Sequence, residues 1–352
     1  MTITPAREIA FRVLLRVTEG AYASDLLRRE SNGLNERDAS LAESIVMGSL
    51  RHRSQLDFLI VHFAGRATLK LDPEVRVALR MGVYQLRYLD RIPAHAAVAE
   101  SVELVKLARK RSAAPMVNAI LRKVNRDPVP WPDRATELSI PQWMLDRWRT
   151  QYADDAEGIA RAALGEPQAY VNEATGRQQD IGAQSIVPLL EIEPGMTLLD
   201  LCAAPGNKTA QAIALGARVI AADRYIKRID AVPGDAARVV LDATEALPFT
   251  TKFDRILIDA PCSGTGTLAH NPEIKWRLKS GDLAEFQIRQ RQMIERALPH
   301  LLPSGLMVYA TCSLEREENE NVVEGFRVIK MQIRLPSREP GDGFFAAVIR
   351  AT

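Results

Sequence analysis

The chain has 352 residues, with 46 Lys+Arg, 44 Asp+Glu and three cysteines. At roughly 100–200 residues per domain this length predicts two or three domains. The hydrophobic (47%) and charged (26%) fractions are ordinary globular values, which excludes disordered, collagen-like and coiled-coil chains. Three cysteines form no even disulfide framework, so we expect a reduced, cytoplasmic protein. Charges interrupt every apolar stretch of the N-terminus, so we expect no signal peptide and no membrane partner.

The net charge of +2 is the sum of two unlike parts. Residues 1–130 contain 21 Lys+Arg and 14 Asp+Glu, a net charge of +7, whereas residues 131–352 contain 25 and 30, a net charge of −5. Such asymmetry favours nucleic-acid binding by the basic part. A basic, solvated helical surface gives the same count, so charge alone leaves both interpretations open.

The first 130 residues have apolar side chains at helical spacing and show no alternating strand pattern. Thr4 can cap a first helix that ends at Gly20, Asn35 can cap a second, and Pro73 begins a third. The predicted helices cover residues 5–19, 35–60, 73–88, 94–108 and 115–125. We therefore expect an all-α bundle of about six or seven helices.

A proline-rich segment over residues 127–133 marks the clearest boundary, because three prolines in five residues prevent a helix. Residues 138–165 then predict one or two short helices. The expected domains are a helical domain over residues 1–127, a linker with a small subdomain over 128–183, and an α/β domain over 184–352.

From about residue 184, short apolar strands alternate with helices. The predicted strands cover residues 197–201, 218–222, 238–241, 253–258 and 306–311, and the predicted helices cover 186–190, 210–215 and 283–302. This order predicts a Rossmann-like parallel sheet covered on both faces. Asp200, Asp223, Asp242 and Asp259 lie at successive strand ends, where ligands bind in such folds.

The loop after the first strand, CAAPGNK, predicts which cofactor binds there. It has neither the dinucleotide nor the Walker pattern, so NAD and ATP are not the first choice. Gly206 allows backbone amides to approach a ligand, Asp223 is placed for a ribose diol, and Asp242 could meet an adenine amino group. The set predicts S-adenosylmethionine. Each aspartate taken singly is explained as well by a turn or a cap.

Two cysteines, Cys262 and Cys312, directly follow neighbouring strands. A lone cysteine is usually a small buried apolar residue, and two are too few for structural zinc, so no metal is expected. A thiolate beside a methyl donor suits methylation of pyrimidine carbon 5, because addition to carbon 6 activates carbon 5. Such a thiol must be partly ionised. Cys202 is interpreted as a packing residue or a backbone contact to the cofactor.

At these motifs the chain resembles a known family. The segments LLDLCAAPGNKT, DAPCSGTGT with NPEIKW downstream, and YATCSLEREENE are similar to those of the Sun/Nol family of RNA cytosine-5 methyltransferases. The N-terminal segments LRHRSQLDFLI and VNAILRKVNR resemble the RNA-binding NusB fold. The fusion is similar to bacterial enzymes that act on 16S ribosomal RNA.

The resemblance implies roles for individual residues. Cys312 would be the nucleophile, Cys262 would aid product release, Asp259 would touch the target base, and Lys208 would lie near the catalytic centre. The implied cofactor and cytosine site consists of Cys202, Ala203, Ala204, Pro205, Gly206, Asn207, Lys208, Asp223, Arg228, Asp242 and Asp259. Because DNA cytosine-5 methyltransferases use the cysteine of a PC motif, Cys262 is the rival nucleophile.

Three segments depart from the family pattern. The loop reads PGNKT where the family usually has PGGKT, but asparagine also tolerates a left-handed backbone, so binding should survive. Residues 225–237 are near the minimum length for a crossover helix. Residues 170–183 are shorter than the family's RNA-facing region.

The expected partner is 16S ribosomal RNA, and the expected state is a monomer. The target base must be unstacked to expose carbon 6, while the basic helical domain holds flanking phosphates. Two alternatives stay open. One is a non-catalytic RNA-binding or antitermination-like protein, against which the intact Cys262, Cys312 and strand-end acids argue. The other is a methyltransferase that acts on transfer RNA, DNA or protein.

Overall fold

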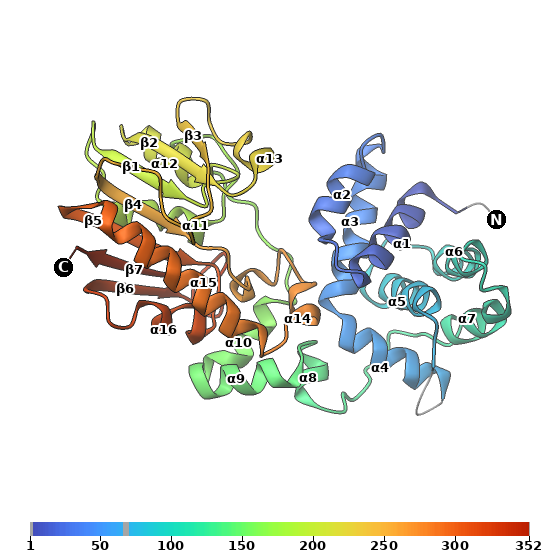
Figure 1. The fold of residues 1–352 in the computed structure, drawn as a ribbon. Helices are drawn as coiled ribbons and strands as arrows, with labels where there is room; N and C mark the ends of the chain where they lie inside the picture. The colour runs from blue at the N-terminus through green and yellow to red at the C-terminus, as the bar shows by residue number, and fades with distance from the viewer. Residues whose placement is uncertain (1–2, 66–69, 352) are drawn as a thin grey trace. The chain divides into compact units, whose positions relative to one another are not determined.

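The computed structural model describes residues 3–65 and 70–351. The chain forms two compact units (Figure 1). The first comprises Met1–Gly165 together with Asn271–Arg277, and the second comprises Glu166–His270 and Leu278–Thr352. The chain therefore passes between the units three times. The expected domain boundaries at residues 127 and 183 stay a prediction.

The described part of the first unit is helical. Its helices are α1 (Pro5–Thr18), α2 (Ala23–Glu30), α3 (Glu36–Arg51), α4 (Arg53–Ala64), α5 (Pro73–Tyr88), α6 (Ala94–Leu107), η1 (Arg111–Ala113), α7 (Ala114–Leu121), α8 (Arg134–Glu137), α9 (Gln142–Tyr152), α10 (Asp155–Ala162) and α14 (Ile274–Arg277). Helix α5 contacts α1, α3, α4, α6 and α7, and the apolar faces of these helices form one core (Figure 1). The predicted helical bundle is confirmed.

The bundle differs from the prediction in three places. Asn35 caps α3 as expected, with its side chain accepting a hydrogen bond from the Asp38 amide. The helix predicted over 35–60 is wrong, however, because the chain breaks at His52, whose ring stacks on Tyr84 and Tyr88. Burial lowers the pKa of His52 to about 4, so this packed ring is neutral. Helix α2 was not predicted, and α7 ends earlier than predicted, at Leu121.

The second unit is built on one seven-stranded sheet. Its strands are β1 (Thr197–Leu201), β2 (Arg218–Asp223), β3 (Ala237–Val240), β4 (Phe253–Asp259), β5 (Leu301–Thr311), β6 (Val328–Arg334) and β7 (Phe344–Arg350). The strand order is β3-β2-β1-β4-β5-β7-β6. The five predicted strands are parallel, but β7 runs antiparallel to β5 and β6, so the expectation of a wholly parallel sheet is wrong.

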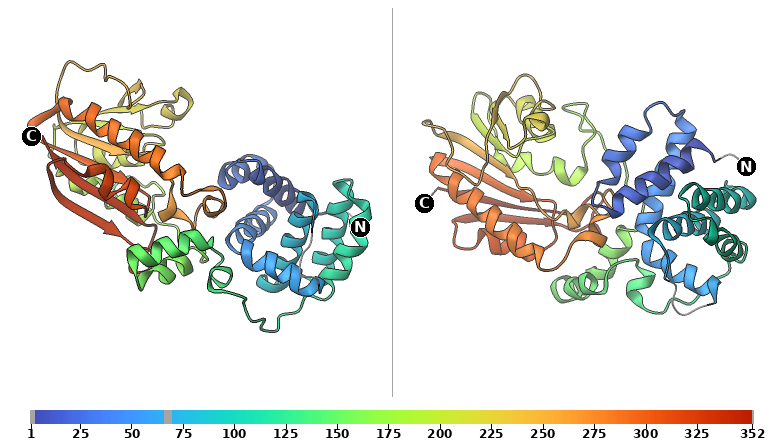
Figure 2. Two further views of the ribbon diagram at one scale, coloured as in Figure 1. Left: turned by 60° about the horizontal axis from the view of Figure 1, so that its bottom comes forward. Right: turned by 45° about the vertical axis from the view of Figure 1, so that its right-hand side comes forward.

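Helical segments cover both faces of this sheet (Figure 2). They are α11 (Ile181–Gln184), η2 (Val187–Leu190), α12 (Asn207–Ala214), α13 (Ile226–Ile229), η3 (Thr265–Thr267), α15 (Asp282–Ala297), η4 (Leu298–His300), η5 (Arg316–Glu318) and α16 (Glu320–Val323). Neighbouring side chains of β1 point to opposite faces of the sheet. Leu198 packs with α12 and η2, whereas Leu199 packs with α15. Helix α15 ends before its predicted end at residue 302, because the chain there is already in β5.

The short connection between β2 and β3 contains only one helical turn, α13. It nevertheless completes a parallel pair, in which Ile220 lies opposite Ala237. Across the described residues, no helix has both the length and the apolar character needed to span a membrane.

Candidate active site

The loop that joins β1 to α12 makes a close turn at the carboxyl edge of the sheet. Cys202 has a positive φ of 63°, and Gly206 has a φ of 94°. A Cβ atom on Gly206 would lie 2.6 Å from Pro233 Cδ and 2.8 Å from Val232 Cα, so only glycine fits there. This packing holds the loop against Val232 and Pro233, which lie between α13 and β3.

A cavity of about 180 Å³ lies next to this loop. It is lined by Cys202, Ala222, Asp223, Arg224, Tyr225, Arg228, Leu241, Asp242, Ala243, Thr244, Pro261, Phe286, Arg289 and Met293. Four of the predicted cofactor residues, Cys202, Asp223, Arg228 and Asp242, thus line one cavity. Its apolar walls and acidic groups suit a nucleoside, which presents a flat ring and a ribose diol.

The two acids of the cavity have defined partners. Asp223 is only 3% exposed, accepts a hydrogen bond from the Tyr225 amide, and lies 3.7 Å from an Arg228 nitrogen. Asp242 accepts hydrogen bonds from the amide and hydroxyl of Thr244 and lies 3.2 Å from Arg224 Nε. The Thr244 hydrogen bonds are the main cause that lowers the pKa of Asp242. Both positions therefore hold carboxylates beside cations.

The rest of the predicted cofactor loop supports the turn and is not part of the cavity lining. The Ala203 amide donates to Ala222 O, and Ala204 O accepts from Arg228. The Pro205 carbonyl and the Asn207 side chain both accept hydrogen bonds from Arg177. Gly206 takes the left-handed turn described above. Asn207 therefore follows the positive-φ residue and does not occupy that conformation itself.

Lys208 and Asp259 form an ion pair. Lys208 Nζ lies 2.7 Å from Asp259 Oδ2, and the lysine side chain is 11% exposed. Burial acts to lower the pKa of Lys208, but Asp259 and the neighbouring Cys312 raise it above its ordinary value. The lysine is therefore a stable cation beside Cys312.

The two predicted catalytic cysteines meet. Ala260 at the end of β4 donates its amide to Ala310 O of β5, which brings the two following loops together. Cys262 Sγ lies 3.3 Å from Cys312 Sγ. The hydrogen bond to Cys312 and burial raise the pKa of Cys262 well above its ordinary value, so Cys262 keeps its proton at neutral pH. Burial likewise raises the pKa of Cys202.

A buried glutamate that the sequence analysis missed joins the two cysteine loops. Glu318, which is fully buried, accepts hydrogen bonds from the Ser263 amide and hydroxyl, from the Ser313 hydroxyl and from Gln290 Nε2. Ser263 follows Cys262 and Ser313 follows Cys312, so one carboxylate positions both thiols. The acidic run LEREENE was visible in the sequence, but nothing in it indicates which acid turns inward.

Close packing of Gly266 against the backbone of Gly343 and Cys312 fixes the Cys312 loop. The Gly266 amide donates to Cys312 O at 2.9 Å, and the Gly343 amide donates to Gly266 O. A Cβ atom on Gly266 would lie 2.2 Å from Gly343 O and 2.9 Å from Cys312 O. Any side chain at Gly266 would therefore displace the backbone of the Cys312 loop.

Asp180, His270 and Asp342 form a further cluster whose possible ligand atoms lie within 4.8 Å of one another. His270 Nδ1 is 3.0 Å from Asp342 Oδ1, and Asp180 Oδ1 accepts hydrogen bonds from the amides of Gly182 and Asp342. The spacing would admit a cation, but these hydrogen bonds hold the cluster together without one.

The sheet order, the nucleoside-sized cavity and the paired thiols, together with a helical unit, define a class: RNA methyltransferases that use S-adenosylmethionine. Residues 187–340 match the family model described as 16S rRNA methyltransferase RsmB/F, and residues 4–126 match that of the NusB family. The chain belongs to the family of ribosomal RNA small subunit methyltransferase B. The predicted fold of both parts and the predicted cofactor are thereby confirmed.

Curated relatives share this organisation along their length. Ribosomal RNA small subunit methyltransferase B of Yersinia pestis bv. Antiqua (strain Angola) is 30% identical, with 97% of this chain and 98% of that protein covered. The enzyme of the same name from Cronobacter sakazakii is 29% identical over 418 aligned positions, with 97% of each covered. This alignment is longer than the chain itself, so that relative has segments which this chain lacks.

Solved structures show the same fold. The crystal structure of PH0851 covers 99% of both chains with a TM-score of 0.79 at 20% identity. A methyltransferase homolog protein from Pyrococcus horikoshii covers 62% of this chain and 97% of its own, with a TM-score of 0.53 at 21% identity. At these identities the likeness concerns the fold alone.

Proposed function

We propose that this protein methylates carbon 5 of a cytosine in 16S ribosomal RNA through a covalent cysteine–cytosine adduct. The observation that carries the proposal is the pair of thiols 3.3 Å apart, at the ends of β4 and β5, beside the Lys208–Asp259 ion pair. The names of the relatives point to small-subunit ribosomal RNA as the substrate.

Cys312 is the nucleophile in this proposal. Its thiol loses a proton, and the thiolate adds to carbon 6 of the cytosine, which makes carbon 5 electron-rich. The Lys208 cation attracts the negative charge of the attacking sulfur. S-adenosylmethionine, when bound, supplies an electrophilic methyl group to carbon 5. Loss of the carbon-5 proton to a base then expels the Cys312 thiolate and restores the aromatic ring.

Cys262 aids the release of product. Its raised pKa keeps it protonated at neutral pH, and its sulfur lies within hydrogen-bond distance of Cys312. A hydrogen bond from Cys262 stabilises the Cys312 thiolate as that group leaves. Asp259, held by Lys208, contacts the polar edge of the base and positions carbon 6 against Cys312.

The cofactor would be held by the cavity at the ends of β1 and β2. Asp223 would accept hydrogen bonds from the ribose diol, and Asp242 would meet the adenine amino group. Cys202 and Arg228 line the same cavity, while Ala203, Ala204, Pro205, Gly206 and Asn207 form the turn that follows Cys202 and lies outside the lining.

Separate variants of the two cysteines test these roles. With 16S rRNA and cofactor, Cys262→Ala should accumulate a protein–RNA adduct that survives denaturing electrophoresis, because product release is slowed. Cys312→Ala should form no adduct and no product. An adduct with Cys312→Ala would instead make Cys262 the nucleophile.

Mass spectrometry identifies which base of which RNA is methylated. After reaction with isotopically labelled S-adenosylmethionine, digested 16S rRNA should contain label in 5-methylcytidine. Transfer RNA serves as the competing substrate. Label on another base, or in transfer RNA alone, contradicts the proposal.

A further inference from the structure

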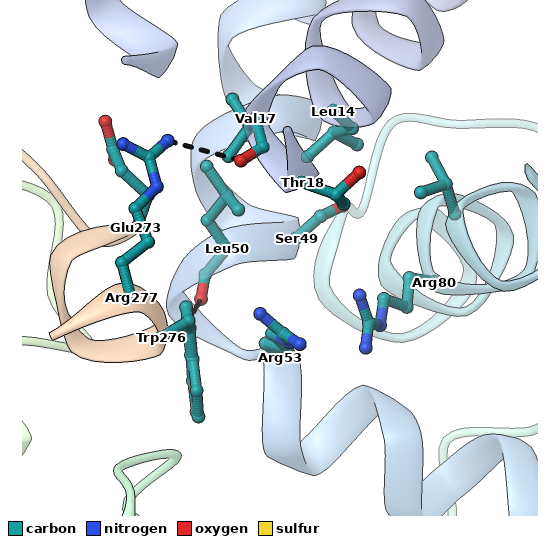
Figure 3. Close-up of a pocket in the computed structure, with 11 residues that line it drawn as sticks. Leu14, Val17, Thr18, Ser49, Leu50, Arg53, Arg80, Glu273, Trp276 and Arg277 are labelled. Carbon is teal, nitrogen blue, oxygen red and sulfur yellow. Dashed lines mark hydrogen bonds between the residues drawn. The ribbon is translucent and has the colours of Figure 1, made fainter. Parts of the chain in front are cut away.

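The helical unit contains a second cavity, of about 180 Å³ (Figure 3). It is lined by Leu14, Val17, Thr18, Ser49, Leu50, Arg53, Val77, Arg80, Glu273, Trp276 and Arg277. These residues come from α1, α3, α4, α5 and the segment Asn271–Arg277, all in the first unit. The proposed mechanism uses none of them.

The segment Asn271–Arg277 fixes one wall of this cavity by capping helices. Glu273 accepts a hydrogen bond from the Ala23 amide at the start of α2. Lys275 and Trp276 donate to the carbonyls of Arg51 and Leu50 at the end of α3. Arg277 donates to Val17 O in the last turn of α1 and to Ala21 O just beyond it. An acid at a helix start and cations at helix ends match the helix dipoles, so the wall is firmly placed.

The cavity holds more buried positive charge than its acids balance. The Arg53 guanidinium lies over the Trp276 ring at 5.2 Å and forms no ion pair among the described residues, since the nearby Asp57 is bound by Arg80. Arg80, whose side chain is 8% exposed, binds Asp57 through two hydrogen bonds of 2.7 and 2.6 Å. Figure 3 shows the guanidinium groups of Arg53 and Arg80 turned toward each other. Burial lowers the pKa of Arg53 to about 10, and the positive charge of Arg80 adds to this effect, while Asp57 opposes it in part.

Three polar atoms of the lining are buried without a hydrogen-bond partner in the part of the chain that the structure describes. They are Ser49 Oγ, Arg277 Nε and Glu273 Oε2. Such groups are few in folded proteins, and each needs an explanation. Two of them can donate to an anion, and the third can accept from a hydroxyl. A phosphate joined to a ribose presents that combination.

We propose that this cavity binds a backbone phosphate of single-stranded RNA together with its ribose. Arg53 and Arg80 pair with the phosphate oxygens, Ser49 donates to the same group, and Glu273 accepts from the 2′-hydroxyl. The cavity is larger than an engineered cavity of about 150 Å³ that holds benzene, so it has room for a phosphate group. The inference rests on the proposed function in taking RNA as the partner.

Arginine variants test the proposal on the full-length protein. The affinity for a 16S rRNA transcript is measured at several KCl concentrations for Arg53→Gln and for Arg37→Gln. Arg37 is an exposed arginine of α3 that has no ion pair among the described residues. Arg53→Gln should weaken binding several-fold and reduce the slope of log K against log[salt] by about 0.7 to 0.9, the loss of one phosphate contact. If Arg53→Gln and Arg37→Gln have the same RNA affinity and the same salt slope, the proposal is wrong.

A second variant, Ser49→Ala, tests the cavity without a loss of stability. Ser49→Ala removes a hydroxyl that makes no hydrogen bond within the described protein, so its melting temperature should equal or exceed that of the wild type. Its RNA affinity should nevertheless fall. Unchanged RNA affinity with both Ser49→Ala and Arg53→Gln excludes the cavity as an RNA site.

Inorganic phosphate distinguishes the source of the anion. If phosphate raises the melting temperature of the wild type but not of Arg53→Gln, while both bind RNA equally, the cavity is a site for free phosphate and the RNA proposal is wrong. Formation of 5-methylcytidine is followed in parallel. A wild type that methylates no cytosine refutes the proposed function, whereas the salt slopes report on the cavity alone.

Discussion

Asp200 and Glu318 are two fully buried acidic residues near the candidate active site, and their surroundings differ. Asp200 accepts a hydrogen bond from Thr209 through one oxygen, and its Oδ1 has no partner among the described residues. Burial raises the pKa of Asp200 to about 7. Glu318 instead accepts hydrogen bonds from three residues, Ser263, Ser313 and Gln290. Asp200 therefore tends to be neutral, while Glu318 organises its neighbours.

The raised pKa of Asp200 predicts a pH dependence of stability. An aspartate in the unfolded chain has a pKa of about 3.9 and so loses its proton near pH 4. In the folded protein Asp200 keeps its proton until about pH 7, so the two states differ in protonation between these values. Asp200 therefore makes the fold less stable as pH rises through this range, and the penalty is complete above pH 7. Asp200→Asn removes the penalty. Its melting temperature relative to the wild type should rise from pH 5 to pH 7 and stay level above pH 8.

A matched control for this experiment is Asp235→Asn, at an exposed position. The melting temperature of this variant relative to the wild type should not vary with pH. A constant difference for Asp200→Asn as well would mean that Asp200 is ionised throughout.

Glu318→Gln tests the link between the cysteine loops. Glutamine has the same size, but its amide nitrogen only donates hydrogen bonds, so it cannot replace the carboxylate oxygen that accepts from the two serine hydroxyls. We expect a loss of about 1 to 3 kcal/mol in stability. The methylation rate at saturating substrate should fall, because both thiols lose their positioning. Glu324→Gln, at an exposed position beyond α16, should change neither quantity. Equal rates for the two variants would contradict a positioning role for Glu318.

At this scale the sequence predicted which candidate residues gather at one edge of the sheet, but not the distances between them. Asp223, Asp242, Cys262 and Cys312 were predicted from their positions after strands. Such positions place side chains at one edge of a sheet without stating which pairs touch. Glu318 was missed because its carboxylate reaches the site through a turn, η5, rather than from a strand end.

Among the elements, the segment Asn271–Arg277 has the most unexpected role. Its sequence, NPEIKWR, was assigned to the catalytic domain with the motif that precedes it. In the structure it provides caps for three helices of the first unit. Charged and aromatic residues in a short stretch resemble a surface loop, so the sequence could not show that Lys275 is only 1% exposed.

Substitution of Trp276 measures how strongly this segment holds the unit. Trp276→Phe keeps a ring beneath Arg53 but loses the hydrogen bond to Leu50 O, and should cost about 1 kcal/mol. Trp276→Ala also removes the ring and should cost about 3 kcal/mol. Urea unfolding of the full-length protein, followed by helical circular dichroism, measures both. No difference between the variants would mean that the ring contributes nothing to the unit.

The strands missed by the sequence analysis lie at one edge of the sheet. Strand β7 is a continuous apolar run, FFAAVIR, which has the same appearance as a buried parallel strand. Its direction depends on the connection from β6, not on its own residues. Strand β6 exposes most of its side chains, including Lys330 and Met331, and is an edge strand next to β7 only. The parallel strands were predicted because each is a short apolar run between helices.

For the whole molecule, the net charge of +2 conceals a basic part and an acidic part. The acids of the second part include Asp223 and Asp242, which line the cavity beside the β1–α12 loop, whereas Arg53 and Arg80 of the first part line the cavity of the helical unit. Deletion of residues 1–127 should therefore weaken RNA binding and flatten its salt dependence, while the affinity for S-adenosylmethionine stays near that of the full chain. Filter binding and calorimetry measure the two affinities. Unchanged RNA affinity in the truncated protein would contradict this division of roles.

The structure adds a second expectation for that truncation. The deletion removes α1, α2 and α3, whose ends the segment Asn271–Arg277 caps. Lys275 and Trp276 would then lose their burial, so the truncated protein should aggregate at lower concentration, as light scattering would show. A truncated protein that also carries Trp276→Ser should aggregate less. The same aggregation with and without Trp276→Ser would contradict this explanation.

The interrupted path of the chain also has a consequence during synthesis. The helices of the first unit leave the ribosome within the first 165 residues, but the segment that caps three of their ends follows about a hundred residues later. At 5–20 residues per second this delay lasts about 5 to 20 s. During that interval the nascent helical unit has an open cavity and helix ends without their caps. It completes its fold only when the segment Asn271–Arg277 leaves the ribosome.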